Sequence, residues 1–417
     1  MNLATDRETA TSSVRAPDVL EKVAPKSRIR ELDGLRGMAI LSVLFYHYIA
    51  IADSGAAPNP LLVKFQHIFG IGWVGVDLFF VLSGFLIGGI LLDARESSHY
   101  FGTFYAHRFY RIIPLYYLWI GIFFAFAAVA FHGLPQALAD NPERLAIAPI
   151  YLLFLQNSAK IPHAAFGTAW LGALWSLAVE EQFYLLMPLA VRFLPRRRLV
   201  PLLCLAIAGA PIARLAFIKY LPQHPAAPYM LTLCRADALA VGVLLAIAWR
   251  DERWKKLFLR HRGFVAATSG VLLFAFAYLA IWKPSQYSVS MAAWGFSCLD
   301  LFFALLLARA LLLPGGVWAA VCRWRFLAEM GRISYCFYVI HAAVNLFTHL
   351  LVLHREPRFA DAPSIVVTVV AAVLAYGLAR LSWTFFEYPL QRRGHAYRYL
   401  PQRAVVGMPA VAAQSES

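Results

Sequence analysis

Residues 31–50 read ELDGLRGMAILSVLFYHYIA and combine a long apolar run with an arginine, Arg36, and a histidine, His47. The run is long enough to cross the hydrocarbon core of a bilayer as one helix. Arg36 and His47 are eleven positions apart, so they fall on one stripe of that helix, about 16 Å apart along its axis. Such residues are costly in a spanning helix and usually face a cavity, a partner or a substrate.

The composition extends this pattern to the whole chain. Of its 417 residues, 60% are hydrophobic and 15% are charged, whereas a soluble domain carries about 25% charged residues. Repeated, continuous apolar stretches predict an all-α polytopic membrane protein and argue against the alternating pattern of a β-barrel. The net charge of +15 is spread over short loops, which favours a topology signal over nucleic-acid binding. None of the five cysteines forms a Cys-x-x-Cys pair, so we expect no disulfide framework and no metal site.

Hydropathy predicts about ten transmembrane helices in one bundle. Their expected ranges are 33–52, 71–92, 111–131, 171–193, 199–219, 229–249, 263–282, 290–312, 331–353 and 364–387. A further apolar segment at 145–156 is too short to span and contains Pro149, so we expect an interfacial or re-entrant piece there. We expect tails at 1–31 and 389–417 on either side of a membrane domain at 32–388.

The distribution of lysine and arginine orients these helices. With both termini in the cytoplasm, the inner segments hold 26 of these residues and the outer loops hold 7. Cytoplasmic loops of membrane proteins carry such an excess, so we expect both tails to be cytoplasmic. The N-terminal residues contain no short apolar core with a cleavage site, so we expect no signal peptide. The chain leaves no stretch for an appended soluble domain, and we expect the chemistry to lie within the bundle.

Polar side chains recur inside the predicted spans, in addition to Arg36 near the inner face and His47 in the outer half. The others are Asp77, Ser83, Glu180, Glu181, Arg235, Asp237, Ser334, Tyr335, Tyr338 and His341. Each has a structural interpretation when taken alone: an arginine and an aspartate can form an ion pair, and a histidine can bridge two helices. Together they exceed what packing requires, which indicates a functional cavity.

A second basic cluster lies in YAHRFYRIIPLYYLW, residues 105–119, where Arg108 and Arg111 share a helix face at the predicted cytoplasmic end of a span. Arginines suit bidentate phosphate recognition, although a topology signal is the simpler interpretation. An inner arginine cluster and a deeper histidine predict a phosphorylated cytosolic donor and a general base that acts on what it delivers. A proton-coupled transporter would use the same residue types.

Seven segments follow one another in a recognisable order: LDGLRGMAILSVLFYH, VDLFFVLSGFLI, HRFYRIIPLYYLW, WSLAVEEQFYLLMP, RADALAVG, ISYCFYVIH and FFEYPL. They are distributed over nearly the whole chain, from about Ile29 to Arg393. In this order they resemble the acyltransferase-3 family of integral membrane O-acyltransferases. The resemblance implies transfer of an acyl group, usually acetyl, from cytosolic acyl-CoA to a hydroxyl, typically on a saccharide destined for the cell surface. It implies that the pair Arg36 and His47 is needed for activity, and that Arg108 and Arg111 contact acyl-CoA.

The resemblance also places Glu181, Tyr338 and His341 near the same cavity. Our hypothesis is that acyl-CoA docks from the cytoplasm with its phosphates near Arg36, Arg108 and Arg111, that Tyr338 also contacts the donor, and that its thioester reaches toward His47. His47 either deprotonates the acceptor hydroxyl or carries the acyl group transiently. Glu181 or Asp77 orients or charge-balances the histidine, and His341 is a further candidate catalytic residue. The expected partners are the bilayer of the bacterial inner membrane, acetyl-CoA and a saccharide.

Two alternatives remain open from the sequence. An enzyme of this class could acylate a small secreted metabolite such as a macrolide. A transporter could move a glycan or another polar solute without modifying it. We expect acceptor specificity to lie in the outer loops, chiefly at 132–170.

Overall fold

The computed structural model describes the chain over five stretches, and among these residues it is helical with no strand. The described stretches are 29–55, 59–131, 147–158, 168–281 and 285–400. The predicted tail at 1–31, the loop at 132–170 and the final residues of the other tail therefore lie wholly or largely outside them. A single isolated bridge joins Asp53 to Arg358.

The helices of the first half of the chain contain Arg36, the pair Arg108 and Arg111, and the adjacent residues Glu180 and Glu181. They are α1 (Arg30–Phe45), η2 (Tyr46–Ala50), α2 (Pro60–Phe69), η3 (Gly72–Val74), α3 (Gly75–Asp93), α4 (Tyr100–Phe131), α5 (Ile147–Leu152), α6 (Thr168–Leu171), η6 (Gly172–Leu174) and α7 (Trp175–Phe193).

The helices of the second half complete the bundle. They are α8 (Arg196–Tyr220), α9 (Ala227–Met230), η7 (Thr232–Arg235), α10 (Ala236–Trp249), α11 (Glu252–Arg260), α12 (Arg262–Ile281), η8 (Met291–Gly295), α13 (Phe296–Leu312), α14 (Val317–Cys322), α15 (Arg325–Leu353), α16 (Ala362–Ser382), η9 (Trp383–Glu387) and α17 (Tyr388–Gly394).

The outer surface of the bundle is apolar, as a membrane protein requires. On α8, Leu205 and Ile212 are each 68% exposed. A water-soluble protein rarely leaves so many large apolar side chains uncovered, whereas lipid covers them at no cost. Among the described residues, seven helical segments are long and apolar enough to cross a membrane. The fold class is confirmed as an all-α multi-pass membrane protein, but the count of about ten spans is not.

Three predicted spans fall on helices outside that group of seven: α1 with η2, α7 and α12. In α1 and α7 the reason is chemical, because these helices carry the titratable residues of the candidate site, including Arg36 and Glu180, which lower their hydropathy. The structure also changes local boundaries. α4 begins at Tyr100, so Arg108 and Arg111 lie well inside a helix. α5 has only 6 residues, too few to span.

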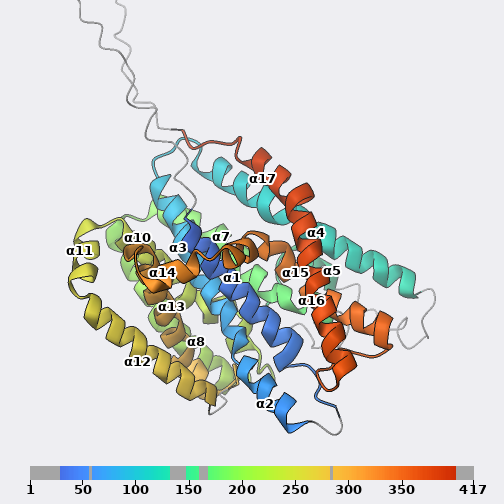
Figure 1. The fold of residues 1–417 in the computed structure, drawn as a ribbon. Helices are drawn as coiled ribbons and strands as arrows, with labels where there is room; N and C mark the ends of the chain where they lie inside the picture. The colour runs from blue at the N-terminus through green and yellow to red at the C-terminus, as the bar shows by residue number, and fades with distance from the viewer. Residues whose placement is uncertain (1–28, 56–58, 132–146, 159–167, 282–284, 401–417) are drawn as a thin grey trace, which may run out of the picture.

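Two helix pairs form the centre of the bundle, where α1 and α3 cross (Figure 1). α1 packs along α15, and α3 packs along α10, each through glycines that bring two backbones together. A Cβ on Gly37 of α1 would lie 2.0 Å from the carbonyl oxygen of Leu327. A Cβ on Gly84 of α3 would lie 2.1 Å from the carbonyl oxygen of Leu239. Small residues permit such close approach between helices in membranes.

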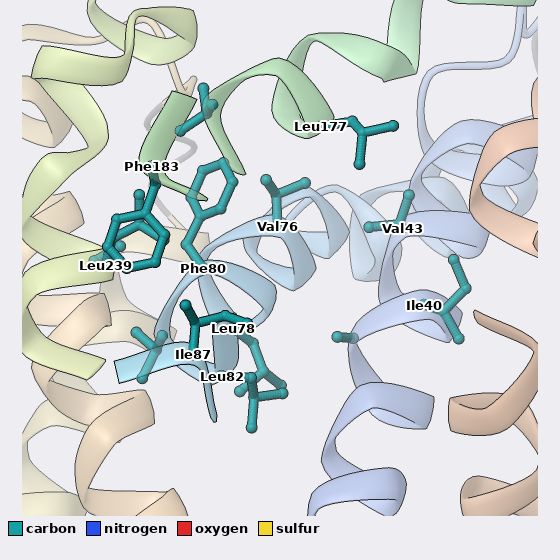
Figure 2. Close-up of a cluster of buried hydrophobic side chains, with 14 of the residues drawn as sticks. Ile40, Val43, Val76, Leu78, Phe80, Leu82, Ile87, Leu177, Phe183 and Leu239 are labelled. Atoms are coloured by element: carbon teal, nitrogen blue, oxygen red, sulfur yellow. The ribbon is translucent and has the colours of Figure 1, made fainter. Parts of the chain in front are cut away.

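Buried apolar side chains from α1, α3, α7 and α10 meet between these pairs (Figure 2). Phe80 and Leu82 of α3 are each 1% exposed, and Val179 of α7 is fully buried. In Figure 2, Ile40 and Val43 of α1 belong to the same buried cluster as Val76 of α3. The core therefore fixes the relative positions of the helices that carry the candidate site.

The two ends of the bundle bring together loops that are far apart in sequence. At one end, Glu31 accepts a hydrogen bond of 2.8 Å from Arg323, and Thr103 donates to the backbone oxygen of Arg398. At the other end, the Asp53 carboxylate lies 2.9 Å from the Arg358 guanidinium. Each contact joins segments that the charge distribution assigns to the same side of the membrane.

Candidate active site

A cavity of about 140 Å³ lies between α1, α3, α4, α7 and α15. Its walls are largely apolar, from α3 side chains such as Phe79 and Leu86. Its polar lining consists of Arg36, Ser83, Arg108, Arg111, Ser176, Glu180, Tyr184, Ser334, Tyr335 and Tyr338. Concave sites with apolar walls and a few converging polar groups are the usual form of small-molecule sites.

Three arginines from two helices converge on this cavity. Arg36 comes from α1, whereas Arg108 and Arg111 come from α4. Repulsion from Arg36 is the strongest charge interaction on Arg111, and Arg108 adds to it. Elsewhere in the described part of the chain, buried arginines form ion pairs: Arg214 pairs with Asp237, and Arg235 pairs with Asp77. Like charges gathered in this way are stabilised by an anion between them, as a phosphate would be.

Arg108 also lies against aromatic rings. Its guanidinium carbon is 5.8 Å from the ring centre of Tyr184 and 6.0 Å from that of Phe104. Cation–π contacts hold a guanidinium in place without using its N–H donors. The Nε–H of Arg108 is buried without a hydrogen-bond partner among the described residues. The group is therefore fixed in orientation and still has donors for a ligand.

Glu180 is the carboxylate that lines the cavity, and it attracts both Arg36 and Arg111. The Tyr184 hydroxyl lies 3.3 Å from Glu180 and 2.8 Å from the Ser83 hydroxyl. Glu180 and Tyr184 are one helical turn apart on α7, so both point into the same space. Glu181 is not among the lining residues, although its charge interacts with that of Arg108, and one of its oxygens has no partner among the described groups.

Tyr338 forms the hydroxyl-rich side of the cavity. Its phenol lies 2.5 Å from the Ser176 hydroxyl and donates to the backbone oxygen of Ala173 at 2.7 Å. Its ring packs edge-on against Phe79, at 6.2 Å between centres. These contacts join α15 to α7 and hold the phenol ring in place at the boundary of the cavity.

Next to Tyr338 lies His341, which in turn contacts His47. The His341 ring centre is 5.8 Å from that of Tyr338 and 4.9 Å from that of His47. The Nδ1 atom of His47 lies 2.9 Å from the Val43 carbonyl oxygen, and Nδ1 of His341 lies 2.7 Å from that of Tyr338. A carbonyl can only accept, so Nδ1 carries the hydrogen in both rings and each Nε2 presents a lone pair. His47 is not itself among the cavity-lining residues.

His47 lies in η2, a five-residue π-helical turn that continues α1. The sequence predicts an uninterrupted helix over 33–52, and the wider turn changes the direction of the side chains at its end. Single π turns of this kind are frequent at functional sites.

Asp77 pairs with a buried arginine, one of the alternatives that the sequence leaves open. It forms an ion pair with Arg235, and both side chains are fully buried. Arg235 also stacks on the Phe296 ring, with the guanidinium carbon 4.2 Å from its centre. Asp77 is not among the residues that line the cavity. The ion-pair interpretation therefore describes the position of Asp77, which joins α3 to η7.

A second buried ion pair was missed by the sequence reasoning. Arg214 of α8 lies 2.8 Å from Asp237, is fully buried, and also donates to Ser297 at 2.9 Å. An ion pair was one interpretation of Arg235 and Asp237, and each of them forms one with another partner. The signal was present as an arginine within the apolar run of α8. These pairs join α3, α8, α10 and α13 beside the cavity, and removing one partner of either pair would leave an uncompensated buried charge, which is strongly destabilising.

Comparison with known proteins assigns this helical bundle to a class. A family model described as an acyltransferase domain matches residues 29–381, which include every helix that lines the cavity, and the chain belongs to this family. The match confirms the resemblance inferred from the seven ordered segments. No solved structure matches the chain.

Several bacterial proteins are similar along most of this chain. O-acetyltransferase OatA of Staphylococcus aureus is 26% identical over 402 residues, covering 92% of this chain and 61% of the relative. The putative peptidoglycan O-acetyltransferase YrhL of Bacillus subtilis is 29% identical over 380 residues, covering 87% and 55%. Peptidoglycan O-acetyltransferase OatA of Listeria monocytogenes is 28% identical over 386 residues, covering 88% and 56%. The chain thus spans little more than half the length of these relatives.

Proposed function

We propose that this protein transfers an acetyl group from cytosolic acetyl-CoA to a hydroxyl of a cell-envelope saccharide, and that it does so in the bacterial inner membrane. The observation that carries the proposal is one cavity with three arginines, bounded by a tyrosine that contacts His341, which in turn contacts His47. Family membership favours an acyltransferase over a transporter. The names of the relatives favour acetyl as the group and a saccharide as the acceptor.

The three arginines suit the phosphates of the donor. Guanidinium groups bind phosphate through paired N–H donors, and Arg108 is already oriented by its aromatic neighbours. Glu180 balances part of their charge, so the site is not prohibitively repulsive before the donor binds. The apolar walls of α3 then accommodate the uncharged arm of the donor and exclude water from the thioester.

His47 is suited to move the proton of the acceptor. Its Nδ1–H is held by the Val43 carbonyl, so Nε2 is the basic nitrogen. In the direct route, the hydroxyl proton moves to Nε2 and the hydroxyl oxygen bonds to the acyl carbon. The carbon–sulfur bond breaks, and the departing thiolate accepts from Nε2 the proton that came from the hydroxyl. In the alternative route, Nε2 first bonds to the acyl carbon, and the carbon–sulfur bond breaks to release the thiolate. The acceptor hydroxyl then attacks the acyl carbon, the bond to Nε2 breaks, and the hydroxyl proton passes to the thiolate.

The arrangement of the bundle supports a cytosolic donor. Arg36 lies near the start of α1, at the end where Glu31 contacts Arg323, and His47 follows the other end of α1. The excess of lysine and arginine assigns the first of these ends to the cytoplasm. A donor that enters from the cytoplasm would therefore meet the arginines before the histidines.

Labelled acetyl-CoA tests this proposal. The protein is expressed again in a strain that lacks its own copy of the gene, and membranes from this strain are incubated with acetyl-labelled CoA. The products are then separated into saccharide and organic-soluble fractions. We expect base-labile label in the saccharide fraction, reduced by unlabelled acetyl-CoA. No transfer from acetyl-CoA would overturn the proposal. Label confined to the organic-soluble fraction would contradict the saccharide acceptor and indicate a small metabolite.

Mass spectrometry of envelope glycans separates the enzyme from a transporter. If the protein is an acetyltransferase, the deletion strain keeps its glycans and loses only acetyl esters from them. Loss of an entire glycan would contradict the proposal and favour transport.

A further inference from the structure

His341 is a fully buried histidine with one unsatisfied nitrogen. Its Nδ1–H donates to the Tyr338 carbonyl at 2.7 Å, and its ring has no exposed surface. Its Nε2 has no hydrogen-bond partner among the described residues. A buried polar atom that lacks a partner costs about 1–3 kcal/mol, so a fold retains one only for a reason.

The same helix contains a second buried histidine for comparison. His349 is also fully buried on α15, and its Nδ1 lies 3.0 Å from the Asn345 carbonyl oxygen. Its Nε2, however, lies 3.3 Å from the Thr368 hydroxyl of α16, which donates its hydrogen to the Ser364 carbonyl oxygen. A polar side chain therefore lies within hydrogen-bond distance of Nε2 in His349, whereas none of the described residues provides one for Nε2 of His341. The unsatisfied Nε2 occurs at the histidine that faces His47.

The position of His341 is closely restrained by its neighbours. The Tyr48 hydroxyl donates to the His341 carbonyl at 2.7 Å, and the Tyr48 ring stacks on the imidazole at 6.3 Å between centres. His47 lies edge-on at 4.9 Å, and Tyr338 at 5.8 Å. A loosely held ring would rotate to find a partner, whereas this one is packed from three directions.

None of these neighbours provides a donor for Nε2. The Tyr338 hydroxyl is engaged with Ser176 and the Ala173 carbonyl, and the Tyr48 hydroxyl with the His341 carbonyl. His47 holds its ring hydrogen on Nδ1, so its own Nε2 is an acceptor as well. The two rings are therefore in contact, none of the described residues donates to Nε2 of His341, and a bound molecule can supply that donor.

We propose that Nε2 of His341 binds the acceptor substrate by accepting a hydrogen bond from a second donor group beside the reacting hydroxyl. One hydroxyl has a single hydrogen, which in the proposed reaction goes to His47. The bond to His341 therefore comes from a neighbouring hydroxyl or amide N–H of the same molecule. This selects a substrate class with adjacent donors, as in a saccharide, over a simple alcohol. The inference deepens the proposed function and rests on it.

Two substitutions separate hydrogen bonding from other roles. The side chain of His341→Asn reaches only the position of Nδ1, so it keeps a donor for the Tyr338 carbonyl and removes the acceptor at Nε2. The side chain of His341→Gln places an amide oxygen near the position of Nε2. His349→Asn is the matched control on the same helix, and His341→Met is a second variant of similar volume without an acceptor.

The assay uses labelled acetyl-CoA and the envelope saccharide fraction of the deletion strain as acceptor. We expect His341→Asn and His341→Met to lower kcat/KM for the acceptor by roughly 10- to 100-fold, the usual effect of losing one substrate hydrogen bond at a buried site. KM for acetyl-CoA should stay within about twofold of wild type, because His341 does not bind the donor. His341→Gln should recover most of the loss, and His349→Asn should retain wild-type transfer.

Three results would overturn the inference: full transfer by His341→Asn, equal loss in His341→Gln and His341→Asn, or a parallel rise in KM for acetyl-CoA. Equal loss would mean that an imidazole is required for a reason other than accepting a hydrogen bond. If wild type transfers acetyl and His341→Asn matches it, the inference fails while the proposed function stands. If wild type transfers none, the proposed function fails.

Discussion

The imidazole rings of His47 and His341 lie 4.9 Å apart and edge to face, although they come from opposite ends of the chain. The contact exists because α1 packs along α15 through glycines such as Gly37. The reactive part of the site is therefore assembled by one helix pair, and anything that separates these helices separates the two histidines.

The first prediction concerns that helix contact. Gly37→Ala places a Cβ about 2.0 Å from the Leu327 carbonyl oxygen, a distance that forces the backbones apart. We expect a loss of about 1–3 kcal/mol in stability, as for other overpacked interiors, together with reduced transfer. Thermal unfolding in detergent and the acetyl-transfer assay measure the two effects. Gly121→Ala is the control, since a Cβ on Gly121 meets nothing within 4 Å. Equal behaviour of the two variants would contradict the assembly argument.

The second prediction concerns donor binding. Arg111→Lys keeps the charge and removes the planar pair of N–H donors that fits phosphate. We expect KM for acetyl-CoA to rise by roughly tenfold or more, with a smaller change in kcat, because binding is lost before the chemical step. Arg253→Lys, at an exposed position on α11, should leave KM unchanged. An unchanged KM in Arg111→Lys would remove this arginine from the donor site.

The third prediction distinguishes the two adjacent glutamates. Glu180 lines the cavity and attracts Arg36, whereas Glu181 does not line it. Loss of a charge-assisted contact is worth roughly 10- to 100-fold, so Glu180→Gln should lower kcat/KM by about that factor. Glu181→Gln should have a smaller effect under the same assay. The reverse order would show that α7 turns Glu181, and not Glu180, toward the bound donor.

The fourth prediction concerns stability and pH at the loop before α16. The Ser364 backbone N–H and the Arg355 guanidinium lower the pKa of Asp361 from 3.8 to about 2. A carboxyl with a lowered pKa stabilises the folded state above its ordinary pKa, and this contribution is lost as the pH falls through about 2. Asp361→Ala removes the capping box and should cost about 1 kcal/mol near pH 7.

Thermal midpoints of wild type and Asp361→Ala in detergent measure this effect. The difference between the two proteins should narrow as the pH falls from 4 toward 2. A difference that is constant over this range would show that the carboxylate charge does not contribute.

The sequence predicted the helical membrane fold and the convergence of the arginines. Apolar runs and the distribution of basic residues report directly on burial in lipid and on orientation. That orientation alone places Arg36 and Arg108 at a similar depth, near the cytoplasmic face. The spacing on the first span singled out His47, the family resemblance added the expected chemistry, and the structure then placed His47 against His341.

Other features depend on tertiary contacts that a linear pattern does not contain. The choice between Glu180 and Glu181 is a matter of helix rotation, which is set by packing of α7 against its neighbours. Asp77 could pair with any buried arginine until α3 and η7 were placed side by side. The unsatisfied Nε2 of His341 is visible only when every neighbouring donor has been identified.

The central claim is that His47 acts on the acetyl group delivered by acetyl-CoA. The most direct test compares labelled acetyl transfer in membranes that contain equal amounts of wild type and His47→Ala. The account predicts that transfer to the saccharide fraction falls by at least about 100-fold in the variant, the usual loss when a general base or nucleophile is removed. Full transfer by His47→Ala would contradict it.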